Sequence, residues 1–302
     1  MKKYADKFLE KLKIELNYSE FTIEWYRQEI EKFNFFIQKN NINYKKLTND
    51  NIRFYLKHLD NLKYSKNSIG RNLSALRTFY KYLSEEQVIN FNPFKNISNP
   101  KKNKKLPNFL NYEEINKIFE SIETDSILKI RNKCIIELLY DTGIRVSELV
   151  NIKIQDIDFE EKTIHIFGKG KKQRIVYFVS FLTNILDMYL NKSRNYLLNG
   201  KDNNYLILNN RGDKITTRGI ELIVDNIVEK SAIKHKISPH VLRHTFASHM
   251  LNNGADIKTI QQLLGHESLS TTGIYTHITS DVLRSEYLKK HPRKWIRKSL
   301  TK

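Results

Sequence analysis

An abrupt change of composition between Asn90 and Pro107 divides the chain. The stretch holds three prolines and the basic cluster 101–105, which reads Lys-Lys-Asn-Lys-Lys. Proline lacks a backbone N–H and clustered lysines resist burial, so this stretch opposes both helix formation and core packing. We therefore predict two domains, residues 1–90 and 108–302, joined by an extended basic linker over residues 91–107.

Apolar residues at helical spacing predict four helices before the linker. Ser19 and Thr48 are suited to cap two of them, and Asn67 or Ser68 is expected to open the fourth. The polar face of this fourth helix and the start of the linker carry candidate contacts to DNA phosphates, namely Arg71, Arg77, Lys81, Lys101 and Lys102. A solvated helix face explains any single one of these charges equally well.

The second domain mixes helices with a small amount of sheet. Asn111 with Glu114 predicts a capped helix, and an apolar helix over residues 126–140 is expected to end at Gly143. Further along, the expected elements are a hairpin of strands 163–167 and 174–178, a helix over 181–197, a strand over 205–208, and a helix from Thr216 or Thr217 to Ser231. The predicted fold is mainly α with a small β-hairpin: a helical N-terminal domain followed by an α+β domain.

The net charge indicates the kind of partner. A formal charge of +19 favours a polyanion, above all nucleic acid, although a lysine- and asparagine-rich composition contributes to it. The single cysteine, Cys134, lies in an apolar run and is expected to be a core residue rather than a catalytic thiol. No signal peptide or run long enough to span a bilayer is visible, so we expect a soluble cytoplasmic protein.

The stretch Ser238–His277 gathers residue types that suit phosphodiester chemistry. It holds His240, Arg243, His266 and Tyr275, and Arg145 and Lys169 lie upstream. Two arginines can clamp a phosphate while charge develops, because a guanidinium matches its oxygens and does not titrate. A tyrosine attacks only with a base at hand, and we assign that role to His240. Lys169 is placed to protonate a leaving oxygen, and His266, expected at a helix C-terminus, to bind a phosphate oxygen.

Other readings of these residues were weighed. Glu148 is expected to hold a buried Arg145 in place, the alternative being an ordinary surface pair. His240 and His244 have the spacing of a zinc pair, but no third ligand is evident, so we predict no metal and no cofactor. The Gly-Lys-Gly turn around Lys169 does not have the full pattern of a phosphate-binding loop, since no helix follows.

With these residues assembled, the chain resembles the tyrosine recombinases, and among them the Xer recombinases. The resemblance runs from about Ser19 to Arg293. The motifs that carry it are Thr-Gly-Ile-Arg-Val-Ser-Glu-Leu around Arg145, Gly-Lys-Gly around Lys169, Pro-His-Val-Leu-Arg-His-Thr-Phe-Ala with His240 and Arg243, Leu-Leu-Gly-His ending at His266, and Ser-Thr-Thr-Gly-Ile-Tyr-Thr-His with Tyr275. One departure is Gly273, where the family has a longer polar residue.

The resemblance implies a helical core-binding, SAM-like domain and a catalytic domain that ends in a helix. It also implies a reaction in which Tyr275 forms a 3′-phosphotyrosyl bond and strand exchange proceeds through a Holliday junction, without metal or ATP. The implied assembly is a tetramer on two double-stranded DNA sites, either homomeric or shared with a second recombinase, with a DNA translocase as an activator. The implied role is resolution of chromosome dimers at a dif-like site on the nucleoid. A phage or mobile-element integrase is the alternative, and a non-catalytic DNA-binding protein is the remote one.

Residues 281–290 predict a last helix with few apolar residues. A helix of this length is not stable alone, so it must dock on its own domain or on a neighbouring protomer. The resemblance favours the neighbour.

Overall fold

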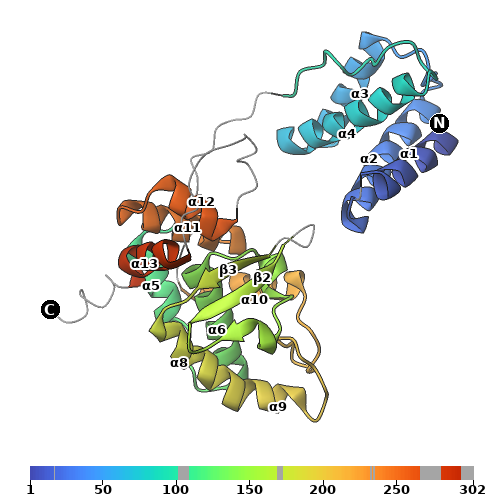
Figure 1. The fold of residues 1–302 in the computed structure, drawn as a ribbon. Helices are drawn as coiled ribbons and strands as arrows, with labels where there is room; N and C mark the ends of the chain where they lie inside the picture. Colours follow the sequence, from blue (N-terminus) through green and yellow to red (C-terminus); the bar gives the residue numbers. More distant parts are fainter. Residues whose placement is uncertain are drawn as a thin grey trace. The chain divides into compact units, whose positions relative to one another are not determined.

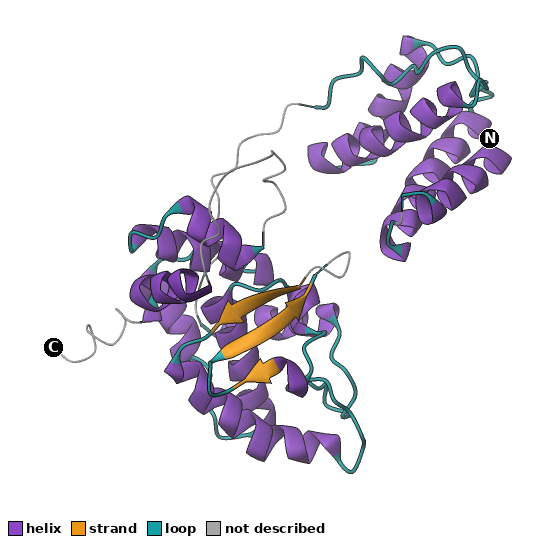
Figure 2. Cartoon of the chain, in the orientation of Figure 1, coloured by secondary structure: helices purple, strands orange, loops and turns teal. Residues whose placement is uncertain are grey.

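The computed structural model describes residues 1–16, 18–100, 109–168, 173–231, 233, 235–265 and 280–293. The chain divides into two compact units, Met1–Lys105 and Leu106–Lys302, each with its own hydrophobic core. Figure 2 shows that helices dominate and that the strands form one small sheet in the second unit. The fold class predicted from the sequence is confirmed. In the described parts of the chain, no helix has the length and apolar character that crossing a bilayer requires.

The first unit is made of helices α1 (Lys2–Ile14), α2 (Glu20–Lys39), α3 (Asn49–Asn61) and α4 (Lys66–Glu85) (Figure 1). Ser19 accepts a hydrogen bond from the Thr22 N–H, and Thr48 forms a reciprocal capping box with Asn51, so both predicted caps are confirmed. The predicted start of α4 was one or two residues late. Ser65 is the cap, because its hydroxyl accepts from the Ser68 N–H.

One buried helix lies at the centre of the second unit. Its elements are α5 (Tyr112–Glu120), α6 (Ile127–Thr142), α7 (Val146–Leu149), a 3₁₀ turn (Ile154–Asp156), β1 (Ile157–Asp158), β2 (Thr163–Phe167), β3 (Gln173–Tyr177), α8 (Ser180–Met188), a π-helical turn (Tyr189–Arg194), α9 (Asn195–Leu198), α10 (Thr217–Lys230), α11 (Pro239–Asn252), α12 (Ile257–Leu264) and α13 (Ser280–Lys290). Helix α6 packs against α8, α10, α11 and the π-helical turn, which explains why 11 of its 16 residues are buried.

The predicted hairpin is confirmed, and a third strand extends it. Strands β1, β2 and β3 form an antiparallel sheet in that order, with Ile164 opposite Val176 at the buried face. The short strand β1 was not predicted, since two residues carry no readable alternation.

The expected helix over 181–197 is present, but it contains the π-helical turn, where Ser193 donates a hydrogen bond to the distant Ile127 carbonyl and Arg194 donates to the Tyr205 carbonyl. One predicted element is wrong. The expected strand over 205–208 forms only isolated bridges, because the Leu206 N–H donates to the Ile152 carbonyl and the Leu208 N–H donates to the Tyr189 hydroxyl. A loop carbonyl and a side-chain hydroxyl take the place of a neighbouring strand there.

The last helix docks on its own unit, which corrects the expectation that it docks on a neighbour. Tyr287 is fully buried in a small cluster with Phe246, Met250 and Leu264, and its hydroxyl donates to the Asp141 carbonyl. Figure 1 shows α13 beside α5, α11 and α12. Tyr287 supplies the apolar area that the rest of this charged helix lacks.

Candidate active site

Arg145 follows directly on the end of α6. Gly143 closes the helix in the left-handed conformation with φ +61°, as its position predicted. A Cβ at this glycine would lie 2.5 Å from Cδ1 of Phe246 and 2.9 Å from Cδ2 of Leu264. Both the backbone angle and the close approach of α11 and α12 therefore require glycine. Two residues later the chain presents the Arg145 side chain, which is partly exposed at the start of α7.

Glu148 is the carboxylate that orients the arginines here. It is buried, and it accepts hydrogen bonds from the Arg145 backbone N–H at 2.7 Å and from Arg145 Nη1 at 3.0 Å. Its predicted pairing with Arg145 is present, but Arg145 itself is exposed and not buried as expected. Burial alone would raise the pKa of Glu148, but the hydrogen bonds from Arg174 and from the Arg145 backbone hold that pKa at about 2.

Arg174 is a site residue that the sequence reasoning missed. Its Nη1 and Nη2 each donate to one oxygen of Glu148 at 2.8 Å, a bidentate pair. Strand β3 carries Arg174 to Glu148 from 26 residues away. The hairpin prediction placed Arg174 on a strand, but only the fold shows which carboxylate that strand meets. A Cβ at Gly265 would come within 2.8 Å of Arg174 Cδ, so this glycine leaves room for the pair.

Arg243 is held by two helix ends rather than by a carboxylate. It is buried, its Nη1 donates to the Gly143 carbonyl at 2.5 Å, and its Nη2 donates to the Leu264 carbonyl at 2.7 Å. These carbonyls lie at the C-terminal ends of α6 and α12, where the helix dipole is negative. Burial and the nearby Arg145 lower the pKa of Arg243 to about 10, so it stays charged at neutral pH.

Arg145 also donates to a carbonyl at the end of α12. Its Nη2 donates to the Gly265 carbonyl at 3.4 Å, next to the Leu264 carbonyl that binds Arg243. The structure thus brings together Arg145, Arg174, Arg243 and the single carboxylate Glu148. Backbone oxygens solvate Arg243 without neutralising it, whereas Arg145 and Arg174 share the carboxylate of Glu148.

His240 lies in the first turn of α11, one turn before Arg243. Pro239 begins the helix, a position that suits its fixed φ and missing N–H, and His240 is exposed. Its ring centroid is 4.3 Å from that of His244. Partial burial, His244, Arg243 and Arg145 lower the pKa of His240 from its ordinary value. The lowered pKa favours the neutral form of this histidine at neutral pH, and a neutral imidazole can accept a proton.

Three of the six predicted catalytic residues lie outside the described residues. Lys169 falls between β2 and β3, and His266 and Tyr275 fall between α12 and α13. The predicted cap of α12 just before this last stretch is present, with Gly265 left-handed at φ +64°. Gly273 also falls outside the described residues.

The side chains predicted to contact DNA from the first unit differ in their exposure and in their bonding partners. Arg71 is exposed, and Lys81 forms only an exposed pair with Glu85. Arg77 is bound to its own unit, since its Nε donates to the Phe94 carbonyl and its Nη2 to the Ile97 carbonyl. Lys101 and Lys102 fall outside the described residues.

His249 and Cys134 are core residues of the second unit. His249 is buried, hydrogen-bonded to the Tyr140 hydroxyl at 2.8 Å and stacked on Tyr112. Cys134 is fully buried, which confirms it as a core residue, and burial raises the pKa of its thiol. No cluster of three or more histidine, cysteine or acidic side chains suited to a metal ion occurs in the described parts of the chain.

A helical unit is thus followed by an α+β unit whose arginines converge beside a neutral histidine, the arrangement of a protein that acts on phosphodiesters with its own cations. The sequence of the second unit matches the phage integrase family over residues 108–281, and that of the first matches the family's N-terminal SAM-like domain over residues 5–87. The chain belongs to the phage integrase family.

Proteins of known class match this sequence over nearly its full length. The chain is 44% identical to the tyrosine recombinase XerC of Oceanobacillus iheyensis, covering 96% of each chain. It is also 44% identical to the XerC of Anoxybacillus flavithermus, covering 95% of this chain and 96% of that one. A crystal structure of the XerH site-specific recombinase bound to its difH substrate superposes with a TM-score of 0.69 at 27% identity, over 93% of this chain and 82% of that one. The chain is a tyrosine recombinase of Xer type, and so a DNA strand-exchange enzyme.

Proposed function

We propose that this enzyme cuts and rejoins double-stranded DNA through Tyr275. The Tyr275 oxygen forms a bond to phosphorus, the bond from phosphorus to the 5′ oxygen breaks, and the DNA is left on the enzyme as a 3′-phosphotyrosine. His240 takes the tyrosine proton, and Lys169 gives a proton to the leaving 5′ oxygen. Arg145 and Arg243 bind the phosphate oxygens as charge develops, and His266 hydrogen-bonds one of them. The 5′-hydroxyl of a partner strand reverses the step and creates a Holliday junction.

One observation carries this assignment. Arg145 and Arg243 reach adjacent carbonyls at the end of α12, and His240 lies one turn from Arg243 with its pKa lowered. Two fixed cations and a neutral base beside them suit in-line attack by a hydroxyl on a phosphodiester. Glu148 supports the arrangement by orienting Arg145.

The biological role that these observations favour is chromosome dimer resolution at a dif-like site. The relatives that share 44% of its residues are named XerC, and the XerH structure holds a difH substrate. On this proposal the chain acts in the cytoplasm, on the nucleoid, as part of a tetramer across two sites. That tetramer consists of four copies or includes a second recombinase, and a DNA translocase activates it.

A single experiment tests both the nucleophile and the site. DNA that is covalently trapped on the protein in cells is recovered after boiling in detergent and sequenced, for the wild type and for Tyr275→Phe. We expect wild-type adducts to accumulate at one dif-like chromosomal sequence and the variant to give none. Adducts from Tyr275→Phe would refute the nucleophile, and adducts at the ends of a mobile element would replace the chromosomal role with that of an integrase.

A further inference from the structure

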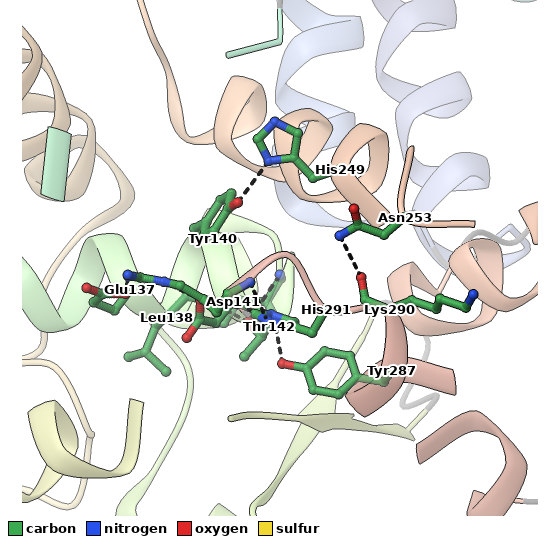
Figure 3. Close-up of polar contacts among 12 residues, drawn as sticks. Glu137, Leu138, Tyr140, Asp141, Thr142, His249, Asn253, Tyr287, Lys290 and His291 are labelled. Carbon is green, nitrogen blue, oxygen red and sulfur yellow. Dashed lines mark hydrogen bonds and ion pairs between the residues drawn. The ribbon is translucent and has the colours of Figure 1, made fainter. Parts of the chain in front are cut away.

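The chain after α13 is anchored to the last turn of α6. The Asp141 carbonyl accepts two hydrogen bonds from this segment, one from the Tyr287 hydroxyl at 2.9 Å and one from His291 Nε2 at 3.0 Å. Figure 3 shows both side chains reaching the end of α6. Tyr287 and His291 are fully buried, so these contacts are shielded from water.

Arg293 completes the anchor in a site that we call the guanidinium receptor, formed by Glu137, Asp141, Phe119 and Phe181. Arg293 Nη2 donates to Glu137 Oε2, and its Nε donates to Asp141 Oδ1 at 3.4 Å. The guanidinium carbon lies 3.6 Å from the ring centre of Phe119 and 4.6 Å from that of Phe181. Two carboxylates and two aromatic faces select a planar cation, and a lysine cannot reproduce these contacts.

The stability of the guanidinium receptor depends on Arg293, because the carboxylates of Glu137 and Asp141 are both fully buried. In the described parts of the chain, Arg293 is the one permanently charged side chain that pairs with either of them. Glu137 Oε1 and Asp141 Oδ2 have no hydrogen-bond partner among the described residues, which leaves each carboxylate with an oxygen still to be satisfied. Burial raises the pKa of Asp141 well above its ordinary value. Without Arg293, each buried carboxyl group must therefore either carry an unpaired charge or take up a proton, and both cost stability at the end of α6.

This turn of α6 is also where the catalytic arginines are held. Gly143, two residues after Asp141, provides the carbonyl that binds Arg243, and Arg145 follows after one more residue. The same C-terminal segment is fixed to α11 as well, since Asn253 Nδ2 donates to the Lys290 carbonyl at 3.0 Å. The anchor thus contacts α11, which carries His240 and Arg243, and the end of α6, which Arg145 follows.

We propose that Arg293 is a positioning residue for DNA cleavage: its binding in the guanidinium receptor fixes the last turn of α6 and, through it, Arg145 and the carbonyl that holds Arg243. This rests on the proposed catalytic roles of those two arginines. Arg293 acts through them and does not touch the DNA phosphate itself.

The receptor opens on solvent, which permits a direct test. A cavity of about 540 Å³ lies beside it, lined among others by Phe181, Arg284, Leu288 and Arg293. In Arg293→Ala this cavity is expected to connect with the empty receptor, so methylguanidinium added at millimolar concentration can enter. Single-turnover cleavage of a nicked suicide substrate is measured together with DNA-site affinity and thermal unfolding.

We expect Arg293→Ala to lower the cleavage rate roughly 10-fold or more while affinity changes less than about threefold, as for the loss of alignment rather than of binding. Methylguanidinium should restore the rate with saturation, and methylammonium at equal concentration should not. Arg293→Lys should resemble the alanine variant. Arg284→Ala is the matched control, because Arg284 lies on the same segment but pairs with Glu161 at the exposed surface; it should cleave normally.

A second variant keeps the test decisive if Arg293→Ala does not fold. Combining Arg293→Ala with Glu137→Gln and Asp141→Asn removes the buried charges together, so the protein is expected to fold, yet it should still cleave slowly and ignore methylguanidinium. Normal cleavage by this variant, or a folded Arg293→Ala that methylguanidinium fails to rescue, would overturn the proposal. Failure of the wild type and of Arg284→Ala to cleave would instead count against the proposed function.

Discussion

A single carboxylate, Glu148, serves two arginines in the catalytic unit. Its pairing with Arg145 was predictable, because the two lie three residues apart at a helix start. Its bidentate pairing with Arg174 was not, because a strand far along the chain supplies the partner. The sequence therefore indicated candidate residues for the chemistry but not all of the residues that orient them. Local spacing is visible in a sequence, whereas strand-to-helix packing is not.

Replacing Glu148 by glutamine tests this role. The amide keeps the shape but presents a neutral acceptor and two N–H groups to two guanidinium groups. We expect cleavage to slow about 10-fold or more and the free energy of unfolding to fall by roughly 2 kcal/mol, the scale of a hydrogen bond to a charged group. Glu161→Gln is the control, since its pair with Arg284 is exposed and its loss should change stability by less than about 1 kcal/mol. Equal effects of both changes would refute an orienting role.

The stabilisation that Glu148 contributes depends on pH. Its pKa is about 2 in the folded protein against an ordinary value of 4.5, so its stabilisation is fully present above pH 4.5 and is lost as the pH falls through 2.

At the scale of elements, the ends of helices were more predictable than their interiors. Ser19, Thr48, Asn111 and Gly143 all cap helices as expected, because capping is a local hydrogen-bond pattern. The π-helical turn between α8 and α9 could not be predicted. Its geometry is fixed by bonds from Ser193 and Arg194 to distant carbonyls, and no local pattern encodes those partners.

The glycine at the end of α6 offers a sharp test of how this element holds the site. In Gly143→Ala the new Cβ would collide with Phe246 and Leu264 in addition to the strained φ. We expect the free energy of unfolding to drop by roughly 2–3 kcal/mol and cleavage to fall with it, because the carbonyl that binds Arg243 must move.

Gly200→Ala provides the matched control for that change. Gly200 also has a positive φ, +79°, but nothing lies within 4 Å of its Cβ position. It should lose only about 1 kcal/mol from backbone strain and keep wild-type cleavage. If both variants cleave normally, the position of the Gly143 carbonyl is not important for catalysis.

At the scale of the whole molecule, each unit has its own core, and the second also depends on the chain that follows α12. The buried carboxylates of α6 were hidden from sequence reasoning, since Glu137 lies in an apolar run that is typical of a core helix. The docking of α13 was also mispredicted, because a few apolar positions do not show that Tyr287 and His291 become fully buried.

Burial of neutral His249 predicts a loss of stability in mild acid. Burial lowers its pKa to about 4, and its ring partners Tyr140 and Tyr112 are uncharged over this range. The unfolded chain binds a proton near pH 6.5, so stability is full above that pH and declines as the pH falls toward 4. Between pH 6.5 and 5 this histidine should account for about 2 kcal/mol. Urea unfolding across this range should show a smaller decline in His249→Gln, and an unchanged decline would assign it to other groups.

The way in which Arg243 is held has a practical consequence for the choice of buffer. Two helix ends solvate its charge without cancelling it, and the exposed Arg145 lies beside it, so the resting enzyme presents positive charge to any small oxyanion. Sulfate or inorganic phosphate should slow cleavage more than chloride does at the same ionic strength, and raising the DNA concentration should relieve the excess inhibition. Equal inhibition by all three salts would mean that general screening of DNA binding accounts for the whole effect. Rates measured in phosphate buffer would then need no correction.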